Sequence, residues 1–246
     1  MNRPAPTTAM LLAAGLGTRM RPLSDRTPKP LIPVAGKALI DWCLDQAAAA
    51  GIATAVVNVH HLADQIVAHC AARATPRVVI SNERVALLDT GGGIVKALPL
   101  LGSAPFLVMN TDGILTDGAA PALSRLFATW QRGGASGIDC AMLVHPREAA
   151  HGFDGAGDFF IEADGRLRRR GGAATAPFVY AGAYVIDPVV FSAAPDGAFS
   201  MNLVWDRLIA AGRMIGVIHD GAWFHVGTPE TIAPTATALA RMGAAR

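Results

Sequence analysis

The chain has 246 residues, of which 52% are hydrophobic, and its 21 Lys and Arg nearly balance its 19 Asp and Glu to give a net charge of +2. This length suits one large domain or a domain with a small appendage, and the apolar content is enough for a large core. The charge is spread without a long run of one sign, which argues against a nucleic-acid-binding domain with a basic stripe.

The cysteines and the N-terminus indicate the type of compartment. Cys43, Cys70 and Cys140 stand singly in apolar or helical contexts, which is the pattern of neither a disulfide framework nor a zinc site. Buried free thiols in a reducing cytoplasm fit this pattern. No apolar run is long enough to cross a bilayer, so we expect no membrane partner. Residues 1–8 are expected to form a flexible leader, and residues 1–246 a single cytoplasmic domain.

Apolar runs typical of buried strands alternate with segments of helical spacing along most of the chain. Strands are predicted at 10–14, 53–59, 78–80, 106–109, 138–144 and 178–186, and helices at 39–50, 62–72, 123–130 and 228–240, with another helix starting at 94. This alternation predicts an α/β fold that is Rossmann-like, with a mostly parallel, mixed sheet and helices on both faces.

A glycine-rich turn follows the first predicted strand. Gly15 and Gly17 allow the backbone to approach a ligand closely, and successive N–H groups in such a turn can bind an anion. Arg19 and Lys29 then supply cationic donors for phosphate. The turn lacks the spacing of a P-loop or of a dinucleotide fingerprint, because Met20 stands where the latter needs its third glycine. It is interpreted as a phosphate- or nucleotide-binding loop.

Two later segments carry further candidate residues. Gly91, Gly92 and Gly93 precede a predicted helix, where free N–H groups and the helix dipole could face an anion or a flat base. The strand at 106–109 delivers Asn110 and Asp112 to its carboxyl end, where open α/β sheets bind ligands. One or two carboxylates with waters and phosphates suit a hard dication, so Asp112 is a candidate metal ligand.

Residues 145–176 differ in composition, with many glycines, acids and arginines. Asp164-Gly165 within an alternating stretch is a hairpin signal. This part is expected to form a small antiparallel insertion.

Several segments together resemble the sugar-1-phosphate nucleotidyltransferases. The matching stretches are LAAGLGTRM at 12–20, Pro22-Leu23, TPKPL at 27–31, DTGG at 89–92 and AWFHVGT at 222–228. The resemblance covers nearly the whole chain and implies the nucleotide-diphospho-sugar transferase type of fold. It also implies an enzyme that joins a nucleoside triphosphate to a sugar 1-phosphate and releases pyrophosphate.

The resemblance implies roles for individual residues. Arg19 would hold the leaving phosphates, Lys29 would bridge the sugar phosphate and the α-phosphate, and Asp112 would hold Mg²⁺, with Mn²⁺ as another possible ion. The expected nucleotide-binding residues are Leu12, Ala13, Ala14, Gly15, Gly17, Thr18, Arg19, Asn82, Glu83, Gly91, Gly92, Gly93 and Asn110, with Asn82 and Glu83 as candidates to read the edge of the base. The expected sugar-binding residues are Asp158, Glu162, Tyr180 and Gly182, and the insertion at 145–176 would cover the sugar side.

This chain departs from the family pattern at the metal. His225 occupies the position where most members carry a second metal-binding aspartate, and Thr111 replaces a glycine. His225 could leave the ion to Asp112, phosphates and water, could favour a softer ion, or could mark a binding protein without turnover. The intact phosphate loop favours the first of these.

The lack of a Glu-Lys-Pro triplet, the compact length and the Thr90–Gly93 run resemble one group of members, the uridylyltransferases that act on N-acetylmuramic acid 1-phosphate in cell-wall recycling. That resemblance implies UTP as the nucleotide. Mannose-1-phosphate guanylyltransferase with GTP is the alternative within the class, and a nucleotide-binding regulatory protein is the alternative outside it. The expected assembly is a monomer or a homodimer without nucleic acid.

Overall fold

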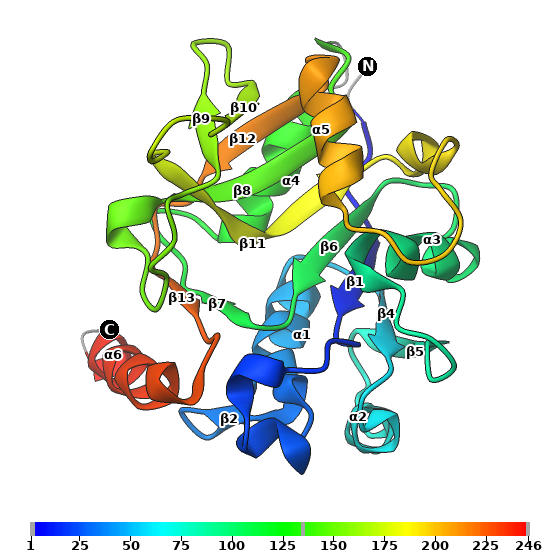
Figure 1. The fold of residues 1–246 in the computed structure, drawn as a ribbon, viewed down its shortest axis with the longest axis vertical. Helices are drawn as coiled ribbons and strands as arrows, with labels where there is room; N and C mark the ends of the chain where they lie inside the picture. Colours follow the sequence, from blue (N-terminus) through cyan, green and yellow to red (C-terminus); the bar gives the residue numbers. More distant parts are fainter. Residues whose placement is uncertain (1–2, 134–135, 245–246) are drawn as a thin grey trace.

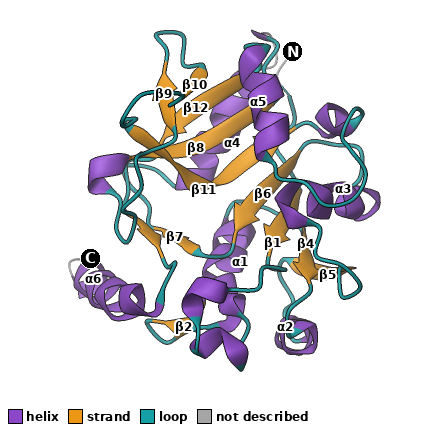
Figure 2. Cartoon of the chain, in the orientation of Figure 1, coloured by secondary structure: helices purple, strands orange, loops and turns teal. Residues whose placement is uncertain are grey.

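A nine-stranded mixed sheet forms the centre of the molecule, and helices cover both of its faces (Figures 1 and 2). The structure is a computed structural model, and it describes residues 3–133 and 136–244. The strands are β1 (Thr8–Leu12), β2 (Pro33–Val34), β3 (Lys37–Ala38), β4 (Thr54–Val59), β5 (Arg77–Asn82), β6 (Phe106–Asn110), β7 (Gly113–Leu115), β8 (Cys140–Pro146), β9 (Phe159–Ile161), β10 (Leu167–Arg169), β11 (Phe178–Ile186), β12 (Met214–Ile218) and β13 (Trp223–His225). The helices are α1 (Leu39–Ala49), α2 (Ala63–Ala71), α3 (Asp89–Leu101), α4 (Ala122–Gly133), α5 (Asn202–Ala210) and α6 (Ile232–Ala244).

The direction of the strands decides where a ligand site can form. β5, β4, β1 and β6 are parallel neighbours, so the carboxyl ends of β1, β4 and β6 meet at one edge of the sheet. β11 runs antiparallel to β6 and to β8, and β12 runs parallel to β8. Because β11 runs the opposite way, it brings its N-terminal half to that same edge. The α/β fold and the mixed sheet expected from the sequence are confirmed.

The core is divided in two by the sheet, because successive side chains of a strand point to opposite faces. In β1, Ala9 and Leu11 pack with buried residues of α1, α2 and α4. Met10 faces the other way and packs with α3 and α5. Both faces of β1 are therefore covered by helices, and its Met10 and Leu11 side chains are fully buried.

A third, smaller core lies beside the sheet and involves the C-terminal helix. Met20, Val34, Phe224 and Val226 are buried together, and α6 packs against them through partly buried apolar residues. This contact joins the segment after β1 to the segment after β13, although the two are about 200 residues apart in the chain.

The expected hairpin forms, and it extends the main sheet. β9 and β10 pair antiparallel, with Asp164 and Gly165 in the turn and a φ of +84° at Gly165. Phe159 of β9 pairs with Phe178 of β11, so the hairpin is attached to the strand that reaches the ligand edge.

The expectation of a flexible leader is wrong for residues 3–8. The guanidinium of Arg3 lies 4.4 Å from the centre of the Trp130 ring and 3.7 Å from a carboxyl oxygen of Asp139. The carbonyl of Thr7 accepts a hydrogen bond of 2.8 Å from the N–H of Ala53. These contacts tie the segment to α4 and to the residues just before β8 and β4, and residues 1–2 lie outside the described residues.

Two expected helix starts also differ. α3 begins at Asp89, so the three glycines lie inside its first turns instead of preceding it. At the C-terminus, the Thr228 side chain makes no capping bond; Pro229–Thr231 forms a 3₁₀ turn and the regular helix begins at Ile232.

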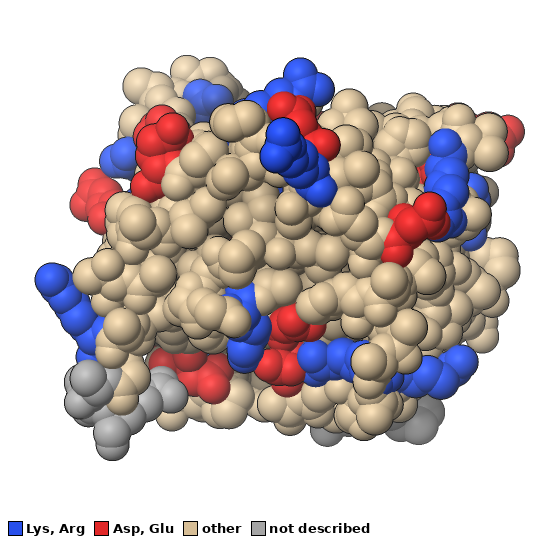
Figure 3. Space-filling view, turned by 90° about the horizontal axis from the view of Figure 1, so that it is seen from below, with Lys and Arg blue, Asp and Glu red and all other residues tan. Residues whose placement is uncertain are grey.

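The surface is of mixed charge where it can be seen. Figure 3 shows Lys and Arg scattered among Asp and Glu on the face turned toward the viewer, with several opposite charges side by side. Within the residues that the structure describes, no helix is long and apolar enough to cross a membrane.

We expect Arg3→Ala to lower the free energy of unfolding by about 1–2 kcal/mol, because it removes a cation–π contact and one partner of the buried Asp139 carboxyl group. Urea titration would measure the change. Arg21→Ala is the control, because Arg21 pairs with Asp25 on the exposed surface, and its effect should stay within about 0.5 kcal/mol. Equal effects of the two substitutions would contradict a structural role for residues 3–8.

Candidate active site

Two adjoining cavities lie at the carboxyl edge of β1 and β6. The first has a volume of about 500 Å³ and the second about 820 Å³. Both are lined by Arg19, Asn110, Asp112 and Gly227, so these four residues mark the junction. The arrangement can hold two ligands that meet at their charged ends.

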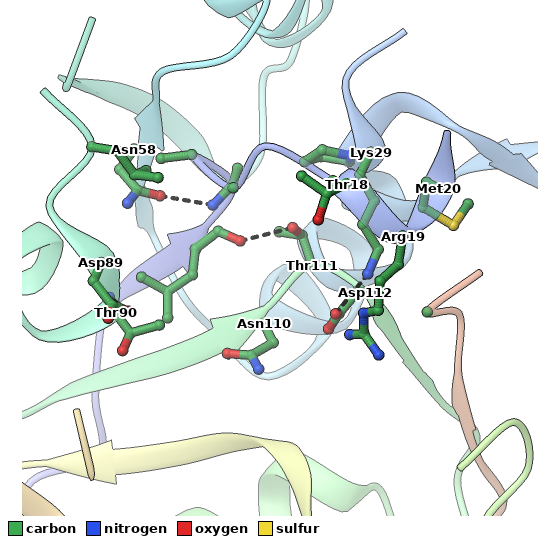
Figure 4. Close-up of a pocket in the computed structure, with 18 residues that line it drawn as sticks. Thr18, Arg19, Met20, Lys29, Asn58, Asp89, Thr90, Asn110, Thr111 and Asp112 are labelled. Carbon is green, nitrogen blue, oxygen red and sulfur yellow. Dashed lines mark hydrogen bonds and ion pairs between the residues drawn. The ribbon is translucent and has the colours of Figure 1, made fainter. Parts of the chain in front are cut away.

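The first cavity gathers most of the predicted nucleotide loop. Leu12, Ala13, Ala14, Gly15, Gly17, Thr18, Arg19 and Asn110 all line it, as do Lys29 and Asp112. Figure 4 shows Lys29, Arg19 and Asp112 at one end and Asn58, Asp89 and Thr90 at the other. The charged end is suited to phosphates, and the opposite end offers small polar groups for a nucleoside.

Gly17 allows the loop to fold back on the segment that carries Lys29. Its φ is +62°, and a Cβ there would lie 3.1 Å from the Cβ of Lys29 and 3.2 Å from that of Ser24. The Ser24 hydroxyl donates a bond of 2.8 Å to the Gly17 carbonyl. Both the positive φ and the close approach therefore favour glycine at this position. Gly15 has open space around it, with no atom within 4 Å of such a Cβ.

Lys29 and Asp112 form the central contact of the site. The Lys29 Nζ lies 2.8 Å from the Asp112 Oδ2, and their side chains are 14% and 26% exposed. Burial by itself raises the pKa of Asp112, but the charge of Lys29, the neighbouring His225 and Arg19, and the bond from Lys29 lower it overall. Asp112 is therefore an anion at neutral pH, ready to hold a cation.

Thr111 has a structural role in place of the glycine that the family usually has here. Its hydroxyl donates a bond of 2.8 Å to the carbonyl of Leu12 (Figure 4). The bond joins the end of β6 to the start of the nucleotide loop. Asp112 is thereby held at a fixed position relative to the loop.

His225 lines the second cavity and lies beside Arg19, one of the residues expected to bind phosphate. A Cβ on Gly227 would lie 2.7 Å from the His225 Nε2 and 3.5 Å from Nη1 of Arg19, so the glycine lets the two side chains come close. Burial, together with Lys29 and Arg19, lowers the pKa of His225, so its ring is neutral at neutral pH. In residues 3–133 and 136–244, no group of three or more His, Cys, Asp or Glu could hold a metal ion. Asp112 and His225 are thus at most part of a ligand set.

The second cavity gathers three of the four residues expected on the sugar side. Asp158, Tyr180 and Gly182 line it. The pairing of β11 with β8 shifts between Tyr180 and Tyr184, and Gly182 has a φ of +83°, which marks a bulge. Asp158 accepts a bond of 2.9 Å from the N–H of Tyr180. Bulges next to sites commonly redirect a side chain, and this one turns β11 toward the cavity.

The fourth residue expected on the sugar side, Glu162, lies elsewhere. Its carboxyl group accepts a bond of 2.7 Å from Arg168 across the β9–β10 hairpin, and it lines neither cavity. The hairpin turns its polar side chains to solvent, whereas the loop at 152–158 that precedes it reaches the cavity. Although Glu162 is close to Asp158 in sequence, it does not share the position of Asp158 in the second cavity.

Asn82 and Glu83 also line neither cavity, so the structure does not support them as readers of the base edge. The Asn82 side chain accepts a bond from the N–H of Arg84 at the surface. Glu83 has no exposed area and cannot touch a ligand.

The glycine run serves packing and not anion binding. The N–H groups of Gly91 and Gly92 both donate to the carbonyl of Phe199, at 2.8 and 3.2 Å, so they are not free for a ligand. A Cβ on Gly91 would lie 2.2 Å from the Phe199 ring, and one on Gly92 would lie 2.2 Å from the Gly197 carbonyl oxygen. The close packing of α3 on the segment before α5 excludes side chains here.

Sequence reasoning gave no binding role to several residues of the first cavity, among them the polar residues Asn58, Asp89 and Thr90. Asn58 carried a usable signal, because it is a polar residue inside the apolar run of β4. Asp89 has a φ of +58°, an uncommon conformation for a residue other than glycine, which no sequence pattern indicates.

Residues 8–168 match the family model described as nucleotidyl transferase. The chain belongs to this family. It is 46% identical to the N-acetylmuramate alpha-1-phosphate uridylyltransferase of Caulobacter vibrioides, an alignment that covers 92% of this chain and 94% of the relative. It is 37% identical to the protein of the same name from Neisseria meningitidis serogroup B, over 89% and 93% of the two chains. These relatives confirm the expected enzyme class, a sugar-1-phosphate nucleotidyltransferase.

Several solved structures share the fold at low sequence identity. A UDP-glucose pyrophosphorylase complexed with UDP-glucose superimposes with a TM-score of 0.78 at 15% identity, over 96% of this chain and 99% of that one. HddC from Yersinia pseudotuberculosis gives a TM-score of 0.74 at 20% identity, over 95% and 99%. The fold type expected from the sequence is therefore confirmed.

Two further buried histidines support the wall of the second cavity. The His145 ring lies 5.7 Å from that of His219 and 6.1 Å from that of Trp223, which lines the cavity. The His145 Nε2 lies 3.1 Å from the carbonyl of Gly221, in the segment that leads to β13. Burial lowers the pKa of both rings, as it does that of His225.

These three histidines predict how stability depends on pH. Their pKa values in the folded state lie below the ordinary 6.5, so the unfolded state binds protons first as the pH falls. The free energy of unfolding should be level near pH 7.5 and decrease from about pH 6.5 downward. Urea titrations across this range would measure it. His145→Gln, which cannot be protonated there, should give a shallower slope, and an unchanged slope would contradict the role given to His145.

Proposed function

We propose that this nucleotidyl transferase transfers the UMP group of UTP to N-acetylmuramic acid 1-phosphate and releases pyrophosphate. The observation that carries the proposal is the junction of the two cavities, where Lys29, Arg19 and Asp112 lie together. The choice of base and sugar is supported by the relatives from Caulobacter and Neisseria, both of which are named as N-acetylmuramate alpha-1-phosphate uridylyltransferases.

In the proposed reaction, UTP occupies the first cavity and the sugar phosphate occupies the second. A phosphate oxygen of the sugar attacks the α-phosphorus in line, the bond from that phosphorus to the leaving oxygen breaks, and pyrophosphate departs. Such transfers depend mainly on positioning and on charge neutralisation. Lys29 is the cation at the meeting point and would bridge the two reacting phosphates, and Arg19 would hold the leaving group.

The residues present fit a divalent ion that arrives with the nucleotide. Mg²⁺ is usually held by one or two carboxylates, substrate phosphates and several waters, and Asp112 supplies one anionic carboxylate at the junction. When bound, such an ion would neutralise charge on the triphosphate. A neutral imidazole is a poor ligand for Mg²⁺, so His225 is proposed to stand beside the ion and not to bind it.

The second cavity suits a sugar. Phe153, Tyr180 and Trp223 give it apolar surfaces, and Asp154 and Asp158 provide carboxylate oxygens that can accept bonds from hydroxyl groups. Part of this lining comes from residues 152–158. We therefore propose that residues 145–176 form the sugar-side insertion of a single catalytic domain over residues 1–246.

Pyrophosphate release is the direct test. UTP, GTP, CTP and dTTP are each combined with the 1-phosphates of N-acetylmuramic acid, mannose and glucose in the presence of Mg²⁺. We expect release with UTP and N-acetylmuramic acid 1-phosphate. Release with GTP and mannose 1-phosphate instead would identify a guanylyltransferase. Nucleotide binding without release in any pairing, with Mg²⁺ or Mn²⁺, would identify a binding protein.

Replacing Lys29 tests its role at the reacting phosphates. Lys29→Met should lower kcat by about 100- to 1,000-fold, because it removes a donor to charge that develops in the transition state. Steady-state kinetics would measure the loss. Lys37→Met is the matched control, because Lys37 pairs with Asp45 outside both cavities, and it should leave kcat unchanged. A rise in KM alone would contradict the role of Lys29.

Replacing His225 tests the metal. His225→Asp places a second carboxylate beside Asp112, so the Mg²⁺ concentration needed for half-maximal rate should fall, by about tenfold. The measurement is a Mg²⁺ titration of the initial rate. An unchanged Mg²⁺ dependence would show that position 225 does not face the ion.

A further inference from the structure

Glu83 is a fully buried carboxyl group outside both cavities, with no exposed area. Each of its oxygens faces a donor. Oε1 accepts a bond of 2.8 Å from Nδ2 of Asn58, and Oε2 accepts one of 3.3 Å from the N–H of Leu88. Two donors suit a group that only accepts, and an amide at this position could satisfy only one of them.

Asn58 connects Glu83 to the nucleotide loop by hydrogen bonds at both ends of its side-chain amide. Its Oδ1 accepts a bond of 2.7 Å from the N–H of Ala13, in the loop after β1 (Figure 4). Because Glu83 takes the nitrogen end of the Asn58 amide, the oxygen end must point toward Ala13. The carboxyl group of Glu83 thus fixes the orientation of a residue that itself lines the first cavity.

The second bond of Glu83 reaches the opposite wall of that cavity. Leu88 is the residue before α3, and Asp89 and Thr90, which follow it, line the cavity. A carboxyl group at the start of a helix also interacts favourably with the helix dipole. Glu83 therefore connects the loop after β1 with the start of α3. It sets the distance between them at the end of the cavity that lies away from Lys29 and Arg19.

Gly93 leaves the space that this network needs. A Cβ at position 93 would lie 2.8 Å from the Glu83 Oε1 and 2.9 Å from the Asn58 Nδ2. These are the two atoms of the central hydrogen bond. A side chain at this position would push them apart. Glycine is therefore required at position 93 by the bond between Glu83 and Asn58, and not by the packing that requires Gly91 and Gly92.

We propose that Glu83 is a positioning residue for nucleotide binding, acting through Asn58 and Leu88 on the two walls of the first cavity. It touches neither ligand. This inference rests on the proposed function only in that the first cavity holds a nucleoside triphosphate. If Glu83 only stabilised the fold, its loss would lower the melting temperature without changing nucleotide affinity once the protein is folded.

The experiment reverses the polarity of the central bond. Glu83→Gln places an amide against the donors of Asn58 and Leu88, so one donor loses its partner. Asn58→Asp alone brings two carboxyl groups together. In the double variant, the amide nitrogen introduced at position 83 donates to the carboxylate introduced at position 58, and the amide oxygen accepts from the N–H of Leu88. The other oxygen of the new carboxylate accepts from the N–H of Ala13, so every bond is restored.

Nucleotide affinity is measured by calorimetry in Mg²⁺, using whichever of UTP, GTP, CTP and dTTP wild type binds most tightly. Each single variant should weaken binding by about tenfold, and the double variant should recover to within about threefold of wild type. At saturating substrates, the kcat of Glu83→Gln should change by less than about threefold, because Glu83 lies outside both cavities and touches no reacting group. Glu148→Gln, at an exposed site outside both cavities, is the control and should bind as wild type does.

Gly93→Ala keeps the inference testable if the charge variants fail to fold. Alanine favours a helix more than glycine does, yet here it should weaken nucleotide binding by about tenfold by displacing the network. Unchanged affinity in Glu83→Gln or in Gly93→Ala, or a double variant no better than the single ones, would overturn the inference. If the proposed base or sugar is wrong, the wild-type protein will show a different substrate preference in the pyrophosphate assay. The binding measurements on these variants will still test the role of Glu83. Failure of wild type to bind any of the four nucleotides would overturn both.

Discussion

The ion pair between Lys29 and Asp112 joins two parts of the chain that are 83 residues apart, and the rest of the site is arranged to hold it. Gly17 lets the Lys29 segment lie against the nucleotide loop, and Thr111 ties the start of the Asp112 segment to the carbonyl of Leu12. On its other side, the Asp112 carbonyl accepts a bond from the N–H of Val226. Since both charges are largely buried, moving either one would leave the other without its partner, a cost of several kcal/mol. The pair therefore couples the positions of β1, β6 and β13.

The sequence allowed the longer strands β1, β4, β5, β6, β8 and β11 and most helices to be predicted, because these depend on short-range patterns, whereas β12 and the short strands β2, β3, β7 and β13 were not predicted. Apolar runs and helical spacing marked β1, β4, β6 and α1 to within a residue or two. Asp112 was predictable for the same reason, since a residue that follows a parallel strand must lie at its carboxyl edge. Glu83 and Glu162 were not, because the end of a strand fixes where a backbone lies but not where a long side chain points. Glu83 turns inward toward Asn58, and Glu162 turns outward toward Arg168.

The three glycines at 91–93 show the limit of such reasoning in a single motif. A run of glycines indicates that there is no room for side chains at these positions. The space next to the glycines can be filled either by a ligand or by other parts of the protein. Here it belongs to the protein: the Phe199 ring at Gly91, the Gly197 carbonyl at Gly92, and the pair of Glu83 and Asn58 at Gly93. The segment still forms one wall of the first cavity, through Leu87, Asp89 and Thr90 just before the run. The resemblance to the family therefore pointed to a segment that lines the first cavity, but the residues that reach the cavity are the neighbours of the three glycines.

His225 changes the charge at the junction of the cavities, and this has a consequence for catalysis. Its ring is neutral because burial lowers its pKa, so Arg19, Lys29 and Asp112 leave one net positive charge there. A second carboxylate in its place would cancel that charge. In the proposed function, the junction accepts a triphosphate and a sugar phosphate, whose mutual repulsion opposes their approach, so a net positive site lowers the energy of bringing them together. On this argument, the neutral imidazole leaves the junction with a net positive charge of its own. That charge neutralises part of the negative charge of the phosphates, which a more tightly held metal ion would otherwise neutralise.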